Sequence, residues 1–330
     1  MEASELREQP AVVGAGAELA RIDPTAIAAR SPWRLFWNRF REDKLAMASL
    51  VFLGLLVLMA IFAPLVVKIF GAPGPNTRDT SALDYFGTPT GPSSSHLFGV
   101  DQIGRDVFSR TIYGARVSLI VAITATGLAT AAGVIAGLLA GYLRGWVDTL
   151  VSRSVDVLLA IPYLLLATGL AASCTLGGAG CLGGLIKPGI GVVIVVIAFT
   201  SWTYMARIIR GQTLSLREKE FVESARSIGA SHTRIVFQEI LPNLVAPIVV
   251  YASILVPQVI LYEAALSFLG VGVQPPTASW GQMISDATPI FSEAWWYMLF
   301  PGLALLFTVL AFNLVGDALQ DALNPRARKT

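Results

Sequence analysis

The sequence has few of the residues from which catalytic and metal sites are built. Its 330 residues include two cysteines and two histidines, and only 14% are charged. His96 and His232 lie far apart and in no motif with a serine, cysteine or threonine, which excludes an obvious nucleophile and base pair or metal site. The chain also lacks the GxxxxGK[ST] loop that holds nucleotide phosphates. We therefore expect no catalytic residue, metal or cofactor in this chain.

Apolar residues dominate instead. They make up 54% of the chain, and the mean hydropathy of +0.65 is too high for a soluble globule. Six runs without charge approach the ~20 residues that a helix needs to cross a bilayer. The sequence predicts an all-α polytopic membrane protein whose six transmembrane helices lie at 45–67, 117–143, 157–172, 188–206, 244–262 and 294–316. The glycines within the second run are typical of close contacts between helices.

The basic residues predict how these helices are oriented. Eighteen of the 24 lysines and arginines lie in segments that six spans place on the same side as the N-terminus. Because positive loops stay in the cytoplasm, both termini and the segment 207–243 are predicted to be cytoplasmic, and the loop 68–116 extracytoplasmic. The net charge of +2 resides in loops rather than in a basic stripe, so no nucleic-acid partner is expected.

The N-terminal region divides into two parts. Residues 1–30 lack the apolar core of a secretory signal, and we interpret them as a disordered cytoplasmic tail. Residues 31–44 begin with Ser31-Pro32, a typical helix start, and aromatic residues then recur on one helical face. This pattern predicts an interfacial amphipathic helix with its aromatic face in the lipid headgroups, formed by Trp33, Phe36, Trp37 and Phe40.

The segment 207–243 is too charged to lie in lipid, with six basic residues and four glutamates. Within it, Phe221, Ala225, Ile228 and Ile235 recur at near-helical spacing, and Gly229 interrupts the helix. Two interpretations are open. The apolar stripe either rests on the protein's own transmembrane bundle or docks into another protein.

Three further polar features could serve structure or function. Glu263, with Gln258 nearby, either faces a translocation path or is a helix-end carboxylate near headgroup water. The group Asp101, Arg105, Asp106 and Arg110 is spaced for surface ion pairs of about 0.5 kcal/mol each. Cys174 and Cys181 lie close enough in an extracytoplasmic loop to form a disulfide.

Several motifs resemble one known family. Glu223-Ser224-Ala225, followed by Gly229 and Leu241-Pro242, resembles the EAA loop of ABC-importer permeases, with Ser224 and Glu239 departing from that pattern. Further blocks, in order between about residues 31 and 326, are similar to the second permease subunit of dipeptide, oligopeptide and nickel importers. They include Gly99-x-Asp101-x-x-Gly104-Arg105-Asp106, Gly272-Val273-Gln274-Pro275-Pro276, Ser279-Trp280-Gly281 and the stretch 311–317.

The resemblance implies the type I ABC-importer fold, with a five-helix core at 117–317 and a cytoplasmic tail at 318–330. It implies a multi-pass protein of the cell membrane that is not itself an enzyme and forms half of a translocation path. Its expected partners are the bilayer, a homologous permease, an extracytoplasmic substrate-binding protein and two cytoplasmic ATPases that bind ATP and Mg²⁺.

The coupling residues that the resemblance implies lie in the segment 207–243: Phe221, Val222, Glu223, Ser224, Ala225, Ile228, Gly229 and Ile235. Gln258 and Glu263 are the candidates for the translocation path. The cargo stays open among dipeptides, longer peptides, nickel chelates and other ligands of peptide size. An ion-coupled carrier is the alternative, but the sequence lacks the charge pairs that it would place at mid-membrane.

Overall fold

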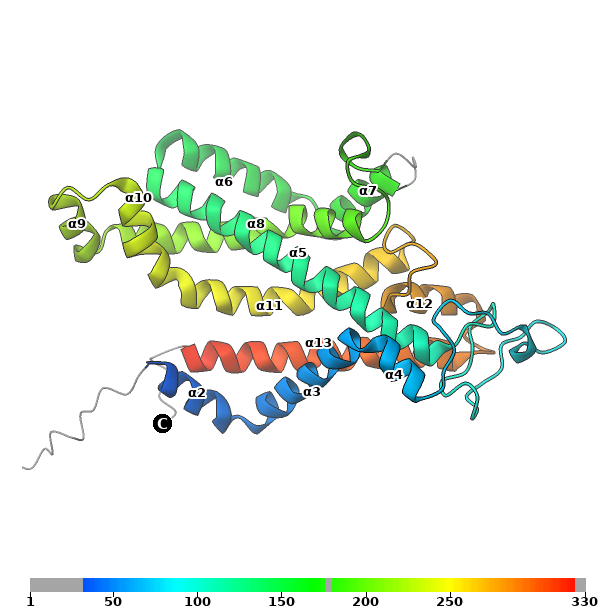
Figure 1. The fold of residues 1–330 in the computed structure, drawn as a ribbon. Coiled ribbons are helices and arrows are strands. Elements are labelled where there is room, and N and C mark those ends of the chain that lie inside the picture. The colour runs from blue at the N-terminus through cyan, green and yellow to red at the C-terminus, as the bar shows by residue number, and fades with distance from the viewer. Residues whose placement is uncertain (1–31, 176–179, 324–330) are drawn as a thin grey trace, which may run out of the picture.

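The computed structural model describes residues 32–175 and 180–323, and in these ranges it contains helices and isolated β-bridges but no strand. The helices form one elongated bundle (Figure 1). The predicted all-α fold is thus confirmed. The predicted N-terminal tail, the Ser31 cap and the last seven residues lie outside the described ranges.

Five helices are long and apolar enough to cross a membrane. They are α3 (Lys44–Ile61), α5 (Val107–Leu143), α8 (Ile190–Arg217), α11 (Leu241–Phe268) and α13 (Trp295–Leu323). The helical turns that begin at His232 continue directly into α11. The remaining predicted span is broken into α6 (Gly145–Ala160) and α7 (Tyr163–Thr175), bent by 93°. The break falls at Ile161, which is extended as expected before Pro162, whose ring interrupts the helical hydrogen bonds.

Several helix boundaries differ from the sequence prediction. The first span, predicted at 45–67, ends at Ile61 and is followed by a separate short helix, α4 (Ala63–Ile69). α5 begins at Val107, so the last ten residues of the predicted loop 68–116 are helical, and Asp106 caps the helix by accepting a hydrogen bond from the Ser109 N–H.

α8 continues to Arg217, well into the segment predicted as a loop. The prediction ended these spans at a charged residue, whereas α5 and α8 include Arg110, Arg207 and Arg210, each of which pairs with an aspartate in the protein.

Helix α5 lies at the centre of the bundle and crosses it diagonally (Figure 1). Its glycines at 133, 137 and 141 lie one turn apart against α8. A Cβ atom on Gly137 would lie 2.7 Å from the Ala206 carbonyl oxygen, so only glycine allows this approach. The predicted close helix contact is confirmed, and α8 is its partner.

The N-terminal helix α2 (Pro32–Glu42) packs against the protein with part of its aromatic face. Phe40 is buried against Ala318 and Ala322 of α13, with Phe36 beside it, whereas Trp37 is 39% exposed. The prediction of a wholly lipid-facing aromatic side is therefore wrong for Phe40. Residues 318–323, predicted as the start of a tail, continue α13 and form this contact.

The glycine contact gives a direct stability test. Gly137→Ala should lower the thermal unfolding midpoint of the detergent-purified protein, because overpacking costs about 1–3 kcal/mol and outweighs the better helix propensity of alanine. Gly127→Ala on the same helix is the matched control, since its Cβ would meet no other described atom within 4 Å. Equal midpoints for the two variants would contradict the close packing of α5 on α8.

Candidate functional site

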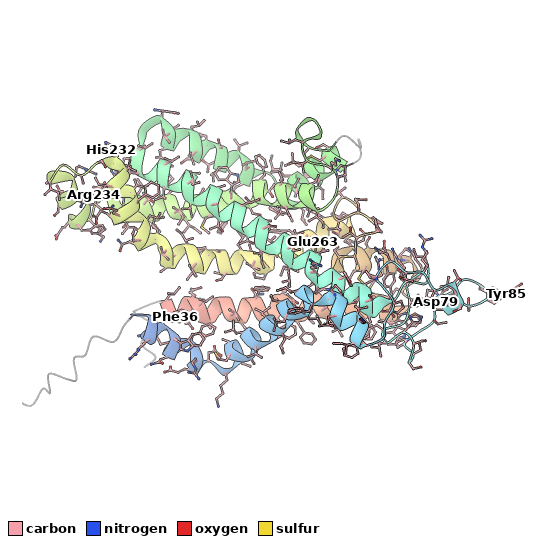
Figure 2. The ribbon with its side chains drawn as sticks, viewed as in Figure 1. Phe36, Asp79, Tyr85, His232, Arg234 and Glu263 are labelled. Carbon is pink, nitrogen blue, oxygen red and sulfur yellow. A yellow bond between two sulfur atoms is a disulfide. The ribbon has the colours of Figure 1, made fainter. Side chains whose placement is uncertain are left out.

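The predicted coupling residues form a compact structure at one end of the bundle. It comprises α9 (Glu220–Ser227), the short α10 (His232–Arg234) and a π-helical turn, Ile235–Ile240, that leads into α11. We call residues 218–240 the coupling segment. Figure 2 places His232 and Arg234 at this end and Tyr85 and Asp79 at the opposite end.

The apolar stripe of the coupling segment is divided between two faces. Val222, Ala225 and Ile235 are buried in a cluster with residues of α5 and α8, including Leu138 and Ile209. Phe221 and Ile228 point away and are 38% and 78% exposed. Each interpretation of the stripe therefore applies to part of it: one face rests on the bundle, and the other is left uncovered in this chain.

Gly229 ends α9 with a left-handed backbone, φ 80°. The Ala230 N–H donates a hydrogen bond of 3.0 Å to the Ala225 carbonyl, as in a Schellman cap. A Cβ atom at this position would have open space, so the requirement for glycine is conformational rather than steric.

The π turn explains why Glu239 and Ile240 depart from the EAA pattern. In an α-helix, the residue four positions after Ile235 would share its buried face, and that residue is Glu239. In the wider π turn, the Leu241 N–H donates a hydrogen bond to the Val236 carbonyl. This turn brings Ile240 to the buried face instead. Both isoleucines are buried and Glu239 is half-buried. The helix thus accommodates a charge where the pattern has an apolar residue.

Polar contacts tie the coupling segment to the last turn of α5. The Tyr142 hydroxyl lies 2.8 Å from His232 Nδ1. Arg217 donates a hydrogen bond to the Tyr142 carbonyl oxygen at 2.6 Å, and its guanidinium lies 5.7 Å from the centre of the Tyr142 ring. Arg144 pairs with Glu218 beside them. Sequence analysis missed Tyr142, because its partners lie 75 to 90 positions away along the chain.

A cavity of about 490 Å³ lies between the broken pair α6–α7, α8 and α11. Gln258, one of the two predicted path residues, lines it. Among the described lining residues none is charged, and the polar ones carry hydroxyls or an amide: Tyr163, Thr200, Ser201, Thr203, Tyr204, Tyr251, Gln258 and Tyr262.

Glu263, the second path candidate, does not line this cavity. Its side chain is fully buried inside the bundle (Figure 2). It accepts hydrogen bonds from the hydroxyls of Ser118 on α5, at 2.9 Å, and of Ser267, at 2.8 Å. Ser267 in turn accepts the Val273 N–H. These hydrogen bonds join α5, α11 and the following loop, whereas a place for Glu263 on the translocation path stays a prediction.

The charged group before α5 is also buried, so the prediction of surface ion pairs is wrong. Asp101 pairs with Arg105 at 2.6 Å and with Arg110 at 3.6 Å, and all three side chains are at most 9% exposed. Asp106 contacts His96 at 2.8 Å. The cause is the loop 71–106, which folds into a cap over the end of the bundle and excludes water. Hydrogen bonds from Ser81 and His96 hold the pKa of Asp79, at the edge of this cap, below its ordinary value.

Other family motifs build the same end of the molecule. Trp280, the first residue of α12 (Trp280–Ala287), is fully buried and its indole N–H donates to the Thr111 carbonyl at 3.0 Å. A Cβ atom on Gly281 would lie 2.5 Å from Ala264 Cα. Outside these motifs, Cys174 and Cys181 are joined by a disulfide as predicted, with their Cα atoms 4.7 Å apart.

Taken together, a bundle of helices long enough to cross a membrane, an amphipathic helix uncovered at one end and a cavity lined partly by hydroxyl and amide groups define a membrane transport protein. Two family comparisons agree. Residues 133–329 match the family described as the binding-protein-dependent transport system inner membrane component. Residues 31–85 match the N-terminal transmembrane domain of oligopeptide transport permease C. The chain belongs to the family of binding-protein-dependent transport system inner membrane components.

Curated relatives cover nearly the whole chain. A protein of Shigella flexneri serotype 5b, named glutathione transport system permease protein GsiD, is 44% identical over 91% of this chain and 92% of its own length. The protein of the same name from Escherichia coli O6:K15:H31 is 42% identical over the same shares. Among solved structures, an inward-facing MetNI methionine ABC transporter matches with a TM-score of 0.55 and 20% identity, over 66% of this chain and 97% of its own. This match shows a shared fold.

The hydrogen bonds of Glu263 distinguish a structural role from a role in the path. Glu263→Gln should keep contacts to both serines and leave the thermal unfolding midpoint nearly unchanged. Glu263→Leu leaves two buried hydroxyls without this partner and should cost about 1–3 kcal/mol of stability. The midpoints of both variants in detergent test this. A Gln variant that is fully stable but prefers cargo of different charge would show instead that Glu263 faces the path.

Proposed function

We propose that this chain is one of two permease subunits of an ABC importer for short peptides, with glutathione, itself a tripeptide, as the first cargo to test. The observation that carries the proposal is the exposed pair Phe221 and Ile228 on a helix anchored to the bundle. The relatives named as glutathione permeases and the match to an oligopeptide permease domain support the cargo class.

The proposed partners follow from what the chain lacks and what it exposes. It has no phosphate-binding loop, so ATP and Mg²⁺ would be bound by two cytoplasmic ATPase subunits. The family description names a binding protein, which would deliver cargo from outside the cell. The spans of this chain would form half of the path, and a second, homologous permease subunit would complete it.

Packing inside the chain would transmit a movement of the coupling segment to the transmembrane helices. Phe221 and Ile228 would dock into a groove on an ATPase subunit, as exposed apolar anchors do at protein interfaces. When the ATPase pair closes, Val222, Ala225 and Ile235 press on α5 and α8 through a tightly packed cluster. Helix α5 has 37 residues, about 55 Å, and reaches from the coupling segment to the opposite cap. Movement at one end would therefore reach the whole path.

The proposed orientation places the coupling segment and both termini in the cytoplasm, and the cap of residues 71–106 outside. The excess of basic residues on the coupling side supports it. Tyr85, 97% exposed at the far tip of the cap, and Ile228 lie at opposite ends of the molecule (Figure 2 labels Tyr85).

Replacing the exposed anchors should uncouple the transporter without unfolding it. In proteoliposomes that hold the complete complex, Phe221→Ala with Ile228→Ala should reduce ATP-driven glutathione uptake at least about tenfold, because docking anchors contribute more than 1 kcal/mol each. Leu185→Ala is the control, since Leu185 lies outside the coupling segment and is 81% exposed, close to the 78% of Ile228. Normal uptake and normal ATPase co-purification by the double variant would overturn the coupling assignment.

Thiol labelling tests the orientation. The two native cysteines are bonded to each other, so an introduced cysteine provides the one free thiol that a maleimide can label. An impermeant maleimide should label Tyr85→Cys in intact spheroplasts, and Ile228→Cys only after the membrane is permeabilised. The reverse pattern would refute the orientation.

A further inference from the structure

The cavity that Gln258 lines borders the break between α6 and α7. Leu159 and Tyr163, on either side of Ile161 and Pro162, both contribute to its wall. The last carbonyls of α6 and the first N–H groups of α7 have no partner within their own helices. Hydrocarbon cannot satisfy such groups, and irregular backbone at membrane depth occurs only inside protein or along a water-filled cavity. If α6 and α7 cross the membrane as one broken span, the break lies at membrane depth, and we expect the adjoining cavity to hold water rather than lipid.

The polar groups of the cavity are arranged to form neutral hydrogen bonds. Tyr204 comes from α8, and Tyr251 and Gln258 come from α11, where they lie two turns apart. The hydroxyls of Thr200, Ser201 and Thr203 are instead hydrogen-bonded within the chain. Hydroxyls both donate and accept, and the carboxamide of Gln258 does the same. These are the groups that match the N–H and C=O of a peptide bond.

Building on the proposed function, we propose that this cavity is a cargo-contact site that hydrogen-bonds the backbone amides of a short peptide during its passage. A fixed charge in the wall would bind some cargo side chains too tightly for release and repel others. Neutral groups bind weakly and equally, as a path requires. The site thus recognises what all peptides share, and discrimination among side chains lies outside this cavity.

Two stacked rings form part of the cavity wall. The Tyr163 and Tyr262 rings lie 3.7 Å apart, centre to centre, and join α7 to α11. The Tyr163 hydroxyl lies 3.4 Å from Ser201 Oγ, which connects α8 to this pair of helices. These contacts fix the positions of the three helices around the site.

Charge placed at Gln258 provides the sharpest test. The complete complex is reconstituted in proteoliposomes with binding protein preloaded with radiolabelled glutathione, and initial uptake is measured per transporter. Gln258→Leu should reduce uptake about three- to tenfold, because the variant loses one neutral hydrogen bond to the cargo. Gln258→Glu should reduce uptake more than Gln258→Lys, because glutathione carries a net negative charge at neutral pH. A residue with only a structural role would not respond to the sign of the charge.

Matched controls separate the site from general damage. Gln320→Glu and Gln320→Lys place the same charges on an exposed residue of α13 outside the cavity and should behave alike. Tyr251→Phe removes one hydroxyl from the cavity with little risk to folding, and Tyr113→Phe removes one from α5, outside it. We expect reduced uptake only for Tyr251→Phe.

The outcomes distinguish the two proposals. If the wild-type complex imports glutathione while the Gln258 and Tyr251 variants match their controls, the cargo-contact site is refuted and the proposed function stands. If the wild-type complex imports neither glutathione nor a radiolabelled dipeptide, the proposed function is refuted, and the peptide site with it.

Discussion

The contact between α5 and α8 is the constraint on which the rest of the structure depends. In hydrocarbon, helices gain no hydrophobic free energy by associating, so close van der Waals packing must hold them together. Gly133, Gly137 and Gly141 provide it by letting the backbone of α5 approach α8 with no intervening side chain. The other helices are then arranged around this pair.

Both regions to which we assign a function in our proposals are built on this pair of helices. At one end, the coupling segment rests on residues of α5 and α8, and Tyr142 ties it to the last turn of α5. In the middle, α8 forms one wall of the polar cavity, and α6–α7 and α11 form the others. A displacement of the coupling segment cannot be absorbed locally, because close-packed interiors transmit strain.

Buried charges are paired or hydrogen-bonded throughout the described residues, which is the condition for having them at all in such a protein. Glu263 is held by two serines, and Asp101 by two arginines under the cap. The described lining of the cavity differs because its polar groups are all neutral, although some of them are also hydrogen-bonded within the fold.

The sequence by itself determined the class of fold, because ~20 apolar residues in a row have few alternatives to a membrane-crossing helix. It also determined the position of the coupling segment, since charge must stay out of lipid, and the need for Gly229 at its helix end. The tertiary structure alone decided which face of that segment is free, because Phe221 and Val222 are both apolar and only packing distinguishes them. In the same way, only the folded chain showed that Gln258 lines a cavity whereas Glu263 is enclosed by serines, since their partners come from helices distant in sequence.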